Sequence, residues 1–293
     1  MINPCPRIAA FHDISGFGRA SLTVAIPILS NMGFQVCPVP TAVLSSHSEF
    51  NDYYMVDFTE HLESYIAHWK RLNISFQSVY SGFLGSPGQI EIVRNFITDF
   101  KQNDQIIIVD PVLGDNGHLY SSIDTGMVDT MRDLVSCCDV MTPNLTEAAL
   151  LLNKKPDREI TLPELKEWLL ELSELGPSGS GKKVVITSAL LSRELNTTSV
   201  VAYDKTDSRY WKVDCTYVPA KYPGTGDAFT SVLTGSLLQG DSLPVAIDRA
   251  VQFVSAGIRA TFGHNMNPKE GFLLEKALVY LRGPAQMFSY ELL

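Results

Sequence analysis

Short apolar runs alternate with amphipathic stretches over the first two thirds of this 293-residue chain. The runs are rich in Val and Ile and bounded by turn residues, which is typical of strands buried on both faces. The predicted strands are Ile8–Phe11, Gln35–Val43, Ser78–Gly82, Gln105–Asp110, Asp139–Thr142, Lys183–Ser188, Ser199–Asp204 and Arg209–Val213. A short polar turn joins the last two strands, which predicts a hairpin.

Apolar residues at helical spacing fill the stretches between the strands. The predicted helices are Phe58–Leu72, Pro87–Phe100, a segment that begins after Thr161, Gly226–Gln239, Leu243–Thr261 and Gly271–Leu281. This alternation of strands and helices implies βαβ units and a parallel sheet. Because the glycine- and serine-rich segment Gly176–Gly181 lies inside the alternation, we expect it to be a surface loop of a single domain over residues 1–293.

The composition, 45% hydrophobic and 19% charged, is that of a folded globular protein. Nucleic acid is not an expected partner, because the net charge is −9 and phosphate-backbone binders usually need a basic face. No apolar run reaches the ~18 residues that span a bilayer. The start of the chain lacks a secretory signal, and five scattered cysteines do not make a disulfide framework. We therefore expect a reduced, cytoplasmic protein without a membrane partner.

The first of three glycine-rich segments, Ser15–Ser21 (SGFGRAS), follows the first predicted strand and precedes a helix, where a dinucleotide-binding fingerprint would stand. Its third glycine position holds Ser21, and the next strand does not end in an acidic residue near Pro38–Val43. NAD binding is therefore not expected. The glycines leave two interpretations open, a loop that approaches a small substrate and a plain tight turn.

The second segment, Gly176–Lys183 (GPSGSGKK), fits the spacing of a phosphate-binding P-loop. Lys183, however, stands where that motif has the Ser or Thr that binds magnesium. The order of elements is also reversed, because a P-loop follows a strand and enters a helix, whereas this segment follows a helix and enters a strand. We therefore predict no phosphate site here.

The third segment, Pro223–Phe229 (PGTGDAF), places two glycines at the start of a predicted helix. Unpaired N–H groups from Gly224 to Asp227 can converge on an anion there, and the helix dipole favours it. Asp227, in the first turn, could be only a cap. The flanking glycines favour a function, since they cost chain entropy unless the backbone must closely approach a ligand.

Acidic residues follow two further predicted strands, at the edge of the sheet where open α/β folds bind ligands. Asp110 ends the strand QIIIVD and could hold a metal-bound phosphate, whereas Asp115, in the next loop, could be only a turn residue. Asn144 and Glu147 would share a helix face after another strand. They could coordinate Mg²⁺ through water or form a capping box, and their spacing allows both.

Thr187 and Ser188 end a further strand, and their hydroxyls could reach phosphate oxygens. An anion hole, a potential base and acidic strand ends would then lie along one rim of one sheet. Phosphoryl transfer needs this combination, because the triphosphate must be positioned, Mg²⁺ must neutralise it, and an acceptor hydroxyl must lose its proton. Asp227 is the candidate base.

The motif around Asp227 resembles the G-[TA]-G-D signature of the ribokinase-like (PfkB-type) kinases. Within that superfamily, DPVLGDNG (Asp110–Gly117) and TPNLTEA (Thr142–Ala148) are similar to motifs of the pyridoxal and pyridoxamine kinases, as is the N-terminal segment from Ser15 to Ser48. The motifs occur in the same order, and the resemblance covers nearly the whole chain.

The resemblance implies a ribokinase-like three-layer α/β/α sandwich with a mostly parallel central sheet. It also implies a homodimer that uses ATP and Mg²⁺ to phosphorylate the 5′-hydroxymethyl group of pyridoxal, pyridoxamine or pyridoxine. A monovalent cation, K⁺ or Na⁺, is an additional candidate cofactor. The glycine-flanked loop Gly114–Tyr120 is the candidate lid over the substrate.

The resemblance further implies roles for individual residues. The family's catalytic base and anion hole fall on Asp227, Gly224, Thr225 and Gly226. The positions that organise the nucleotide phosphates fall on Asp110, Asp115, Asn144, Glu147, Thr187 and Ser188. Within that set, Asp110 and Glu147 would hold the metal. The substrate positions fall on Asp13, Ser15, His47, Ser48 and Phe83.

Some positions depart from the pyridoxal kinase pattern. Pyridoxal kinases often carry Ser where this chain has Asp13, and an Asp there resembles the hydroxymethylpyrimidine kinases of thiamine synthesis, as does the Gly-rich SGFG. Phe83 keeps the ring of the family's usual Tyr and lacks its hydroxyl. Hydroxymethylpyrimidine kinase is therefore the alternative function. A non-catalytic vitamin-binding paralogue is a second alternative, which the intact GTGD disfavours.

Overall fold

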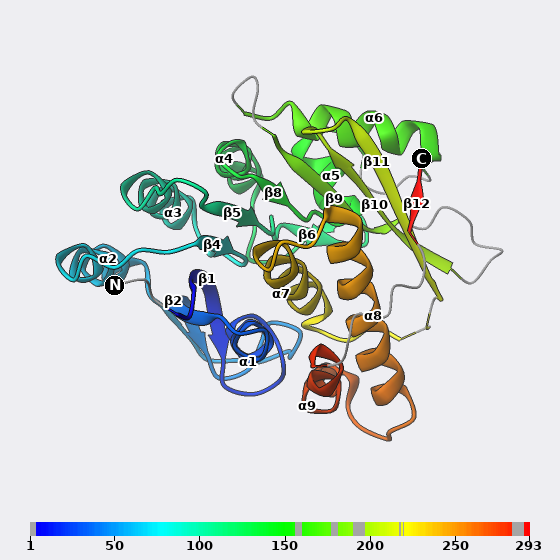
Figure 1. Ribbon diagram of the computed structural model, residues 1–293. Helices are drawn as coiled ribbons and strands as arrows, with labels where there is room; N and C mark the ends of the chain where they lie inside the picture. Colours follow the sequence, from blue (N-terminus) through cyan, green and yellow to red (C-terminus); the bar gives the residue numbers. More distant parts are fainter. Residues whose placement is uncertain are drawn as a thin grey trace.

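Six parallel strands form the centre of a ten-stranded sheet (Figure 1). The computed structural model describes residues 4–293 except 156–159, 177–180, 190–196, 217, 219 and 283–289. The parallel strands are β1 (Arg7–Ser15), β2 (Gln35–Leu44), β4 (Ser78–Ser81), β5 (Ile106–Val109), β8 (Val140–Met141) and β9 (Lys183–Ala189). They lie in the order β9-β8-β5-β4-β1-β2, which confirms the predicted parallel sheet.

Antiparallel strands extend the sheet at both edges. They are β3 (Met55–Asp57) beside β2, and β10 (Thr197–Asp204), β11 (Arg209–Thr216) and β12 (Glu291–Leu292) beyond β9. The predicted hairpin is confirmed, since β10 and β11 pair from Asp204 with Arg209 outward. A separate small hairpin joins β6 (Gly114–Asp115) and β7 (His118–Leu119), within the loop expected to be a lid.

Helices cover both faces of the sheet, so the molecule has the predicted three-layer α/β/α architecture (Figure 1). On one face lie α2 (Thr59–Arg71), α3 (Pro87–Asp99), α4 (Thr125–Ser136), α5 (Leu145–Leu151) and α6 (Leu162–Ser173). On the other lie α1 (Leu22–Asn31), α7 (Thr225–Leu238), α8 (Leu243–Phe262) and α9 (Leu274–Ala277). No helix among the described residues is long and apolar enough to cross a membrane.

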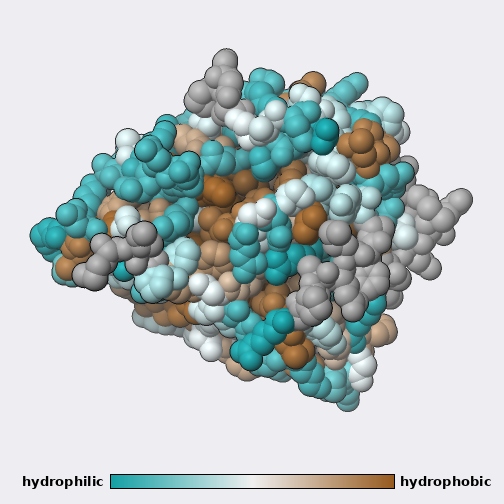
Figure 2. Space-filling view, in the orientation of Figure 1, coloured by the Kyte–Doolittle hydropathy of each residue, from teal (hydrophilic) through white to brown (hydrophobic). Residues whose placement is uncertain are grey.

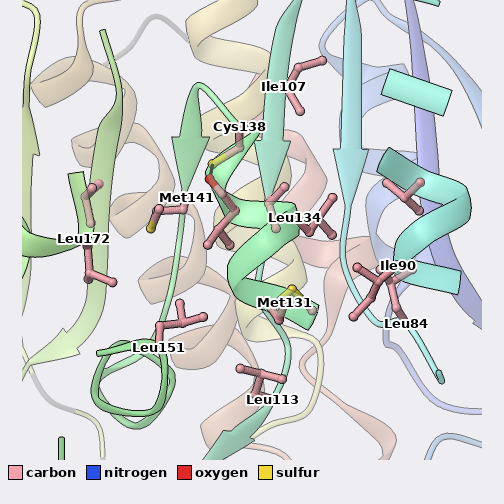
Figure 3. Packing of buried hydrophobic residues seen from close by; sticks show 14 of the residues in the cluster. Leu84, Ile90, Ile107, Leu113, Met131, Leu134, Cys138, Met141, Leu151 and Leu172 are labelled. Carbon is pink, nitrogen blue, oxygen red and sulfur yellow. Dashed lines mark hydrogen bonds between the residues drawn. The ribbon is translucent and has the colours of Figure 1, made fainter. Parts of the chain in front are cut away.

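Each layer of helices buries its own apolar cluster against the sheet. The first cluster includes Met131 and Leu134 of α4, Ile107 of β5 and Met141 of β8, and Cys138 packs among them as a small apolar residue (Figure 3). Figure 2 shows polar residues over the outer helices and hydrophobic residues visible between the layers. This division follows from strands that are apolar on both faces and helices that are apolar on one.

The strand order reverses beside β1, because the chain first moves from β1 to β2 and then returns across β1 to β4. Open α/β sheets bind their ligands at such a switch point, beyond the carboxyl ends of the strands. Asp13, Asp110 and Asn144 all stand at or just after the carboxyl ends of parallel strands. The topology therefore brings the predicted site residues to one edge of the sheet.

The prediction of one helix over Gly271–Leu281 is wrong. The segment starts after a 3-10 turn at Pro268–Glu270, and only α9 and a second 3-10 turn, Leu278–Leu281, are helical. Gly271 adopts φ 82°, which a helix cannot contain, and Phe272 is fully buried against Gly257 of α8. Burial of this ring thus directs the chain away from a helical path. The prediction also missed α4 and the short edge strands.

The rejection of the P-loop is supported by the path of the chain, which leaves α6 and enters β9. Most of the predicted surface loop Gly176–Gly181 lies outside the described residues. Lys182, at its end, is fully buried, and its ammonium group donates to the carbonyl oxygens of Val135 (2.7 Å) and Leu175. This lysine therefore binds backbone carbonyls and is not exposed to a phosphate.

Candidate active site

Helix α7 begins in the conformation that an anion hole requires. Gly224 caps the helix with φ 80°, and a Cβ there would lie 2.2 Å from the carbonyl oxygen of Arg19, so only glycine fits. A Cβ on Gly226, by contrast, would meet no atom of the described residues within 4 Å. The side of the first turn of α7 at Gly226 is therefore open, close to the helix N-terminus, where the dipole favours an anion. Thr225 closes the turn by donating its hydroxyl to the carbonyl of Tyr222 (3.1 Å).

Asp227 stands beside this open space in the first turn of α7. Its Oδ2 accepts the backbone N–H of Ser21 (2.8 Å), and its side chain keeps 15% of its surface exposed. Burial, and then the neighbouring carboxylate of Asp13, raise the pKa of Asp227 to about 6. A carboxylate with such a pKa is ionised at neutral pH and is a better proton acceptor than an ordinary aspartate.

The raised pKa of Asp227 predicts the acid limb of the pH–rate profile. We expect kcat/KM to fall as the pH drops through about 6, because protonation of this carboxyl removes the base. The measurement is kcat/KM between pH 4.5 and 9 at two Mg²⁺ concentrations, with activity recovered at pH 7.5 as the control for unfolding. If the acid limb reports the ionisation of Asp227, its apparent pKa does not change when the Mg²⁺ concentration is raised. A profile that is flat down to pH 4.5 would contradict the prediction.

A polar layer lies between the sheet and α7. Asp110 follows β5 and is buried, and Oδ2 accepts the hydroxyl of Thr230 from α7 (3.2 Å). The hydroxyl of Thr230 also lies 3.0 Å from that of Thr142, at the end of β8. Burial, and then the charge of Asp227, raise the pKa of Asp110 to about 7. The layer thus holds two carboxyls that each disfavour the ionisation of the other.

Asn144 and Glu147 form the capping box that their spacing allows. Asn144 Oδ1 accepts the N–H of Glu147 (3.0 Å), and Glu147 Oε2 accepts the N–H of Asn144 (2.8 Å). The other oxygen of Glu147 accepts the N–H of Leu113 (3.1 Å), and the amide of Asn144 donates to the carbonyl of Gly114 (2.8 Å). This box therefore fixes the start of α5 and the root of the β6–β7 hairpin together.

The donor set fits Mg²⁺ only through a mixture of direct and water-mediated contacts. Glu147 is buried, and burial and then the charge of Asp110 hold its pKa well above the usual range. A divalent cation beside this pair would relieve that repulsion. Both oxygens of Glu147 already accept backbone N–H groups, and the described residues contain no cluster of three metal-binding side chains. Mg²⁺ often keeps several waters and takes phosphate oxygens, so such a sparse protein set suits it.

The β6–β7 hairpin is tied to the loop that precedes the anion hole. Asp115 Oδ2 accepts from the ammonium group of Lys221 (2.6 Å), and the N–H of Gly117 donates to the hydroxyl of Thr146 (2.9 Å). Lys221, which the sequence did not single out, is exposed. An exposed ion pair of this kind contributes little stability by itself, and the role of the hairpin as a lid stays a prediction.

Asp13 and Ser15 lie at the end of β1, and both are buried. The carboxylate of Asp13 accepts the hydroxyls of Ser21 (2.5 Å) and Ser15 (3.4 Å). Burial raises its pKa, against the opposing effect of these hydrogen bonds. Ser21 therefore links the two carboxylates, through its hydroxyl to Asp13 and through its N–H to Asp227. The sequence indicated Ser21 only as the residue that replaces a glycine.

The other substrate positions differ in what they contact. His47 is buried, its Nε2 lies 2.6 Å from the carbonyl of Lys269, and its Nδ1 accepts the N–H of Glu49 (3.3 Å). Ser48 is exposed, and Phe83 is half-buried after β4. In this structure His47 therefore fastens the β2–β3 connection to the Lys269 loop. Its direct role in substrate binding stays a prediction, as do those of Ser48 and Phe83.

Thr187 and Ser188 lie near the end of β9. The N–H of Thr187 donates to the carbonyl of Pro143 (3.0 Å), which sets the end of β9 beside the start of α5. Thr187 is half-buried, and Ser188 is exposed with φ 58°. Both are thus on the edge of the sheet that also carries Asn144, and their contact with phosphate stays a prediction.

A glycine-capped helix N-terminus, a carboxyl of raised pKa in its first turn and a second acidic pair beyond β5 and β8 of a parallel sheet fit the ribokinase-like class of small-molecule kinases. The model of the phosphomethylpyrimidine kinase family matches residues 30–271, and the chain belongs to this family. It is similar to a pyridoxal kinase from Arabidopsis thaliana, with 27% identity over 264 residues that cover 85% of this chain and 80% of the relative.

Two solved structures are similar over nearly their whole length. One is a Bacteroides thetaiotaomicron protein assigned as a phosphomethylpyrimidine kinase and crystallised with pyridoxal. It is 55% identical, with a TM-score of 0.94 over 99% of this chain and 100% of that one. The other is a pyridoxal kinase from Lactobacillus plantarum, 29% identical, with a TM-score of 0.85 over 94% of this chain and 96% of that one.

Proposed function

We propose that this protein is an ATP-dependent kinase that phosphorylates the 5′-hydroxymethyl group of pyridoxal, pyridoxamine or pyridoxine in the salvage of vitamin B6, with pyridoxal giving pyridoxal 5′-phosphate directly. The observation that carries this proposal is the position of Asp227, a carboxyl of raised pKa in the first turn of a helix that is capped by Gly224 and open at Gly226. The Bacteroides thetaiotaomicron structure that contains pyridoxal supports the B6 vitamers as the substrate class.

In this mechanism Asp227 accepts the proton of the hydroxymethyl group as its oxygen attacks the phosphorus atom in line. The N–H groups from Gly224 to Asp227 stabilise the charge on the phosphoryl oxygens. ATP supplies the phosphoryl group, whose bond to the leaving oxygen breaks as the new P–O bond forms. Asp227 then releases its proton to solvent, which the exposed part of its side chain permits.

Asp110 is the residue that would hold Mg²⁺ directly, and Glu147 would act through a water molecule because its oxygens accept backbone N–H groups. Thr230 orients Asp110 for this role. Asp115, Thr187 and Ser188 remain the candidates for contacts to the nucleotide. K⁺ or Na⁺ is a further candidate cofactor, and a homodimer is the expected assembly.

One observation favours hydroxymethylpyrimidine as a second candidate substrate. Asp13 places a buried carboxylate at the end of β1, and its pKa is raised by burial. A carboxyl of this kind can bind a ring nitrogen or an amino group, both of which an aminopyrimidine offers. The name of the matching family agrees with this alternative. The B6 vitamers are preferred because the relative at 55% identity contains pyridoxal.

A comparison of four substrates tests the proposal. With Mg-ATP held constant, we would measure kcat/KM for pyridoxal, pyridoxamine, pyridoxine and hydroxymethylpyrimidine by ADP formation, each with K⁺, with Na⁺ and without either ion. We expect at least one B6 vitamer to exceed the pyrimidine by tenfold or more. The opposite order would replace the proposed function with the pyrimidine kinase. Pyridoxal binding without ADP formation would identify a non-catalytic vitamin-binding protein.

A further inference from the structure

His12 is a fully buried histidine directly behind the candidate base. It lies on β1, has no exposed surface, and neither ring nitrogen has a hydrogen-bond partner among the described residues. Its Nδ1 is 3.9 Å from Oδ1 of Asp227. Buried polar atoms are almost always hydrogen-bonded, because an unpaired one loses its bonds to water and gains none in the protein. An unpaired imidazole beside a catalytic carboxylate therefore needs a physical explanation.

The surroundings of His12 hold its ring in one place. Tyr80 of β4 contacts the ring edge-on, with the two centroids 4.3 Å apart. On another side, a Cβ on Gly82 would lie 2.2 Å from both Nδ1 and Cε1 of His12, so the ring occupies the space that a side chain at position 82 would fill. The imidazole is thus packed between Tyr80 of β4 and Gly82 just after that strand, with Nδ1 3.9 Å from Oδ1 of Asp227.

The protonation state of His12 follows from this burial. Burial lowers the pKa of His12 to about 3, so the ring is neutral at any working pH. A neutral imidazole carries one N–H donor and one acceptor nitrogen. If Nδ1 were the acceptor, its lone pair would face the negative Oδ1 of Asp227. A proton on Nδ1 turns that repulsion into attraction, so the carboxylate selects this tautomer.

We propose that His12 is a positioning residue, whose Nδ1–H donates to Oδ1 of Asp227 and fixes the plane of that carboxylate. The proposal rests on the assigned role of Asp227 as the base. Because the ring is held in place, a shift of about 1 Å in the partly exposed side chain of Asp227 brings the two atoms into hydrogen-bond range. Oδ2 already accepts the N–H of Ser21, so each carboxylate oxygen then has one protein donor. The remaining lone pairs are left for the substrate hydroxyl, while His12 keeps its proton throughout.

Three substitutions of His12 distinguish a hydrogen-bond donor from a filler of space. Asparagine puts its amide near the position of Nδ1, glutamine puts it near Nε2, and leucine has no polar group. We expect His12→Leu and His12→Gln to lower kcat at least tenfold with KM for ATP and vitamin within twofold. We expect His12→Asn to keep kcat within threefold. If Asn loses as much activity as Leu, or if Leu retains full kcat, the proposal is overturned.

Ser81→Ala is the matched control. Ser81, on β4, is buried like His12, and its hydroxyl has no hydrogen-bond partner among the described residues. It lies opposite Phe11 in the strand register and therefore faces the other helix layer from His12. We expect this variant to keep wild-type kcat, which shows that loss of a buried polar atom near the switch point is not enough to slow the reaction. A loss of kcat equal to that of His12→Leu would contradict the assigned positioning role.

The tautomer of His12 in the wild-type protein gives a readout that does not depend on kinase activity. In proton–nitrogen spectra of the imidazoles of the full-length protein at pH 7.5, we expect His12 to carry its proton on Nδ1, with the signal assigned by its loss in His12→Asn. A proton on Nε2, or an imidazolium, overturns the proposal. A wild-type protein without kinase activity on any tested substrate would instead overturn the proposed function, and the spectrum would still report the tautomer.

Discussion

Replacement of Asp227 by asparagine is expected to lower kcat about 10³-fold while ATP binding changes by less than threefold. The amide has the same shape as the carboxylate, and its oxygen can still accept the N–H of Ser21, so the start of α7 should remain in place. What is lost is the proton acceptor, and general base catalysis typically contributes 10²–10⁴ to the rate. Steady-state kinetics with calorimetric ATP titration measures both quantities. A kcat within tenfold of the wild type would show that another group takes the proton.

The stability of this variant is its control. Because the pKa of Asp227 is raised to about 6 in the folded protein, from 3.8 when exposed, its ionisation destabilises the fold as the pH rises through 6. With allowance for the exposed part of the side chain, this cost is on the order of 2 kcal/mol at pH 8. Asparagine has no such cost, so Asp227→Asn should melt at a higher temperature than the wild type at pH 8, with a smaller difference at pH 5. An inactive variant that is also less stable at pH 8 would indicate a folding defect.

The fold was predictable to the extent that it depends on local pattern. Val- and Ile-rich runs between amphipathic stretches predicted the parallel strands, and the polar turn Lys205–Ser208 predicted the β10–β11 hairpin. The order of the strands was not predictable, since adjacency in the sheet depends on which crossover each helix makes and not on the composition of any one run. Gly271–Leu281 shows a second limit, because burial of Phe272 against α8 is a tertiary contact that overrides helical spacing.

The site residues show the same difference between local and tertiary signals. The glycines around Asp227 predicted an N-terminus open to an anion, because that property belongs to a few consecutive residues. The pair Asn144 and Glu147 predicted both a cap and a metal site, and the structure contains the capping box, while the metal role stays a prediction. Ser21 and His12 carried no recognisable signal. Ser21 meets Asp227 across 206 positions of sequence, and such a contact exists only once the sheet has formed.

Substitution of Gly226 is expected to have the second large effect on activity. It tests the proposed anion hole separately from the stability of the fold. Since a Cβ at Gly226 would enter open space, Gly226→Ala should fold with unchanged or slightly higher stability, because alanine is about 1 kcal/mol better than glycine in a helix. The same methyl group would occupy the space assigned to the phosphoryl oxygens and hold them away from the N–H donors. We expect kcat/KM for ATP to fall at least tenfold with alanine and about 10²-fold with valine, a loss comparable to removal of one oxyanion donor.

Two other glycines make this test specific. Gly263, at the end of α8, is also a position where a Cβ would enter open space, so Gly263→Ala should leave kcat/KM for ATP unchanged. Gly224→Ala should instead lose stability, because its Cβ would lie 2.2 Å from the carbonyl oxygen of Arg19 and its φ is 80°. Thermal melts and ATP titrations of the three variants therefore separate a blocked ligand from a damaged fold. Wild-type kcat/KM for ATP in Gly226→Val would mean that the phosphoryl group is held elsewhere, because a phosphate bound at the first turn of α7 has no room beside an isopropyl group.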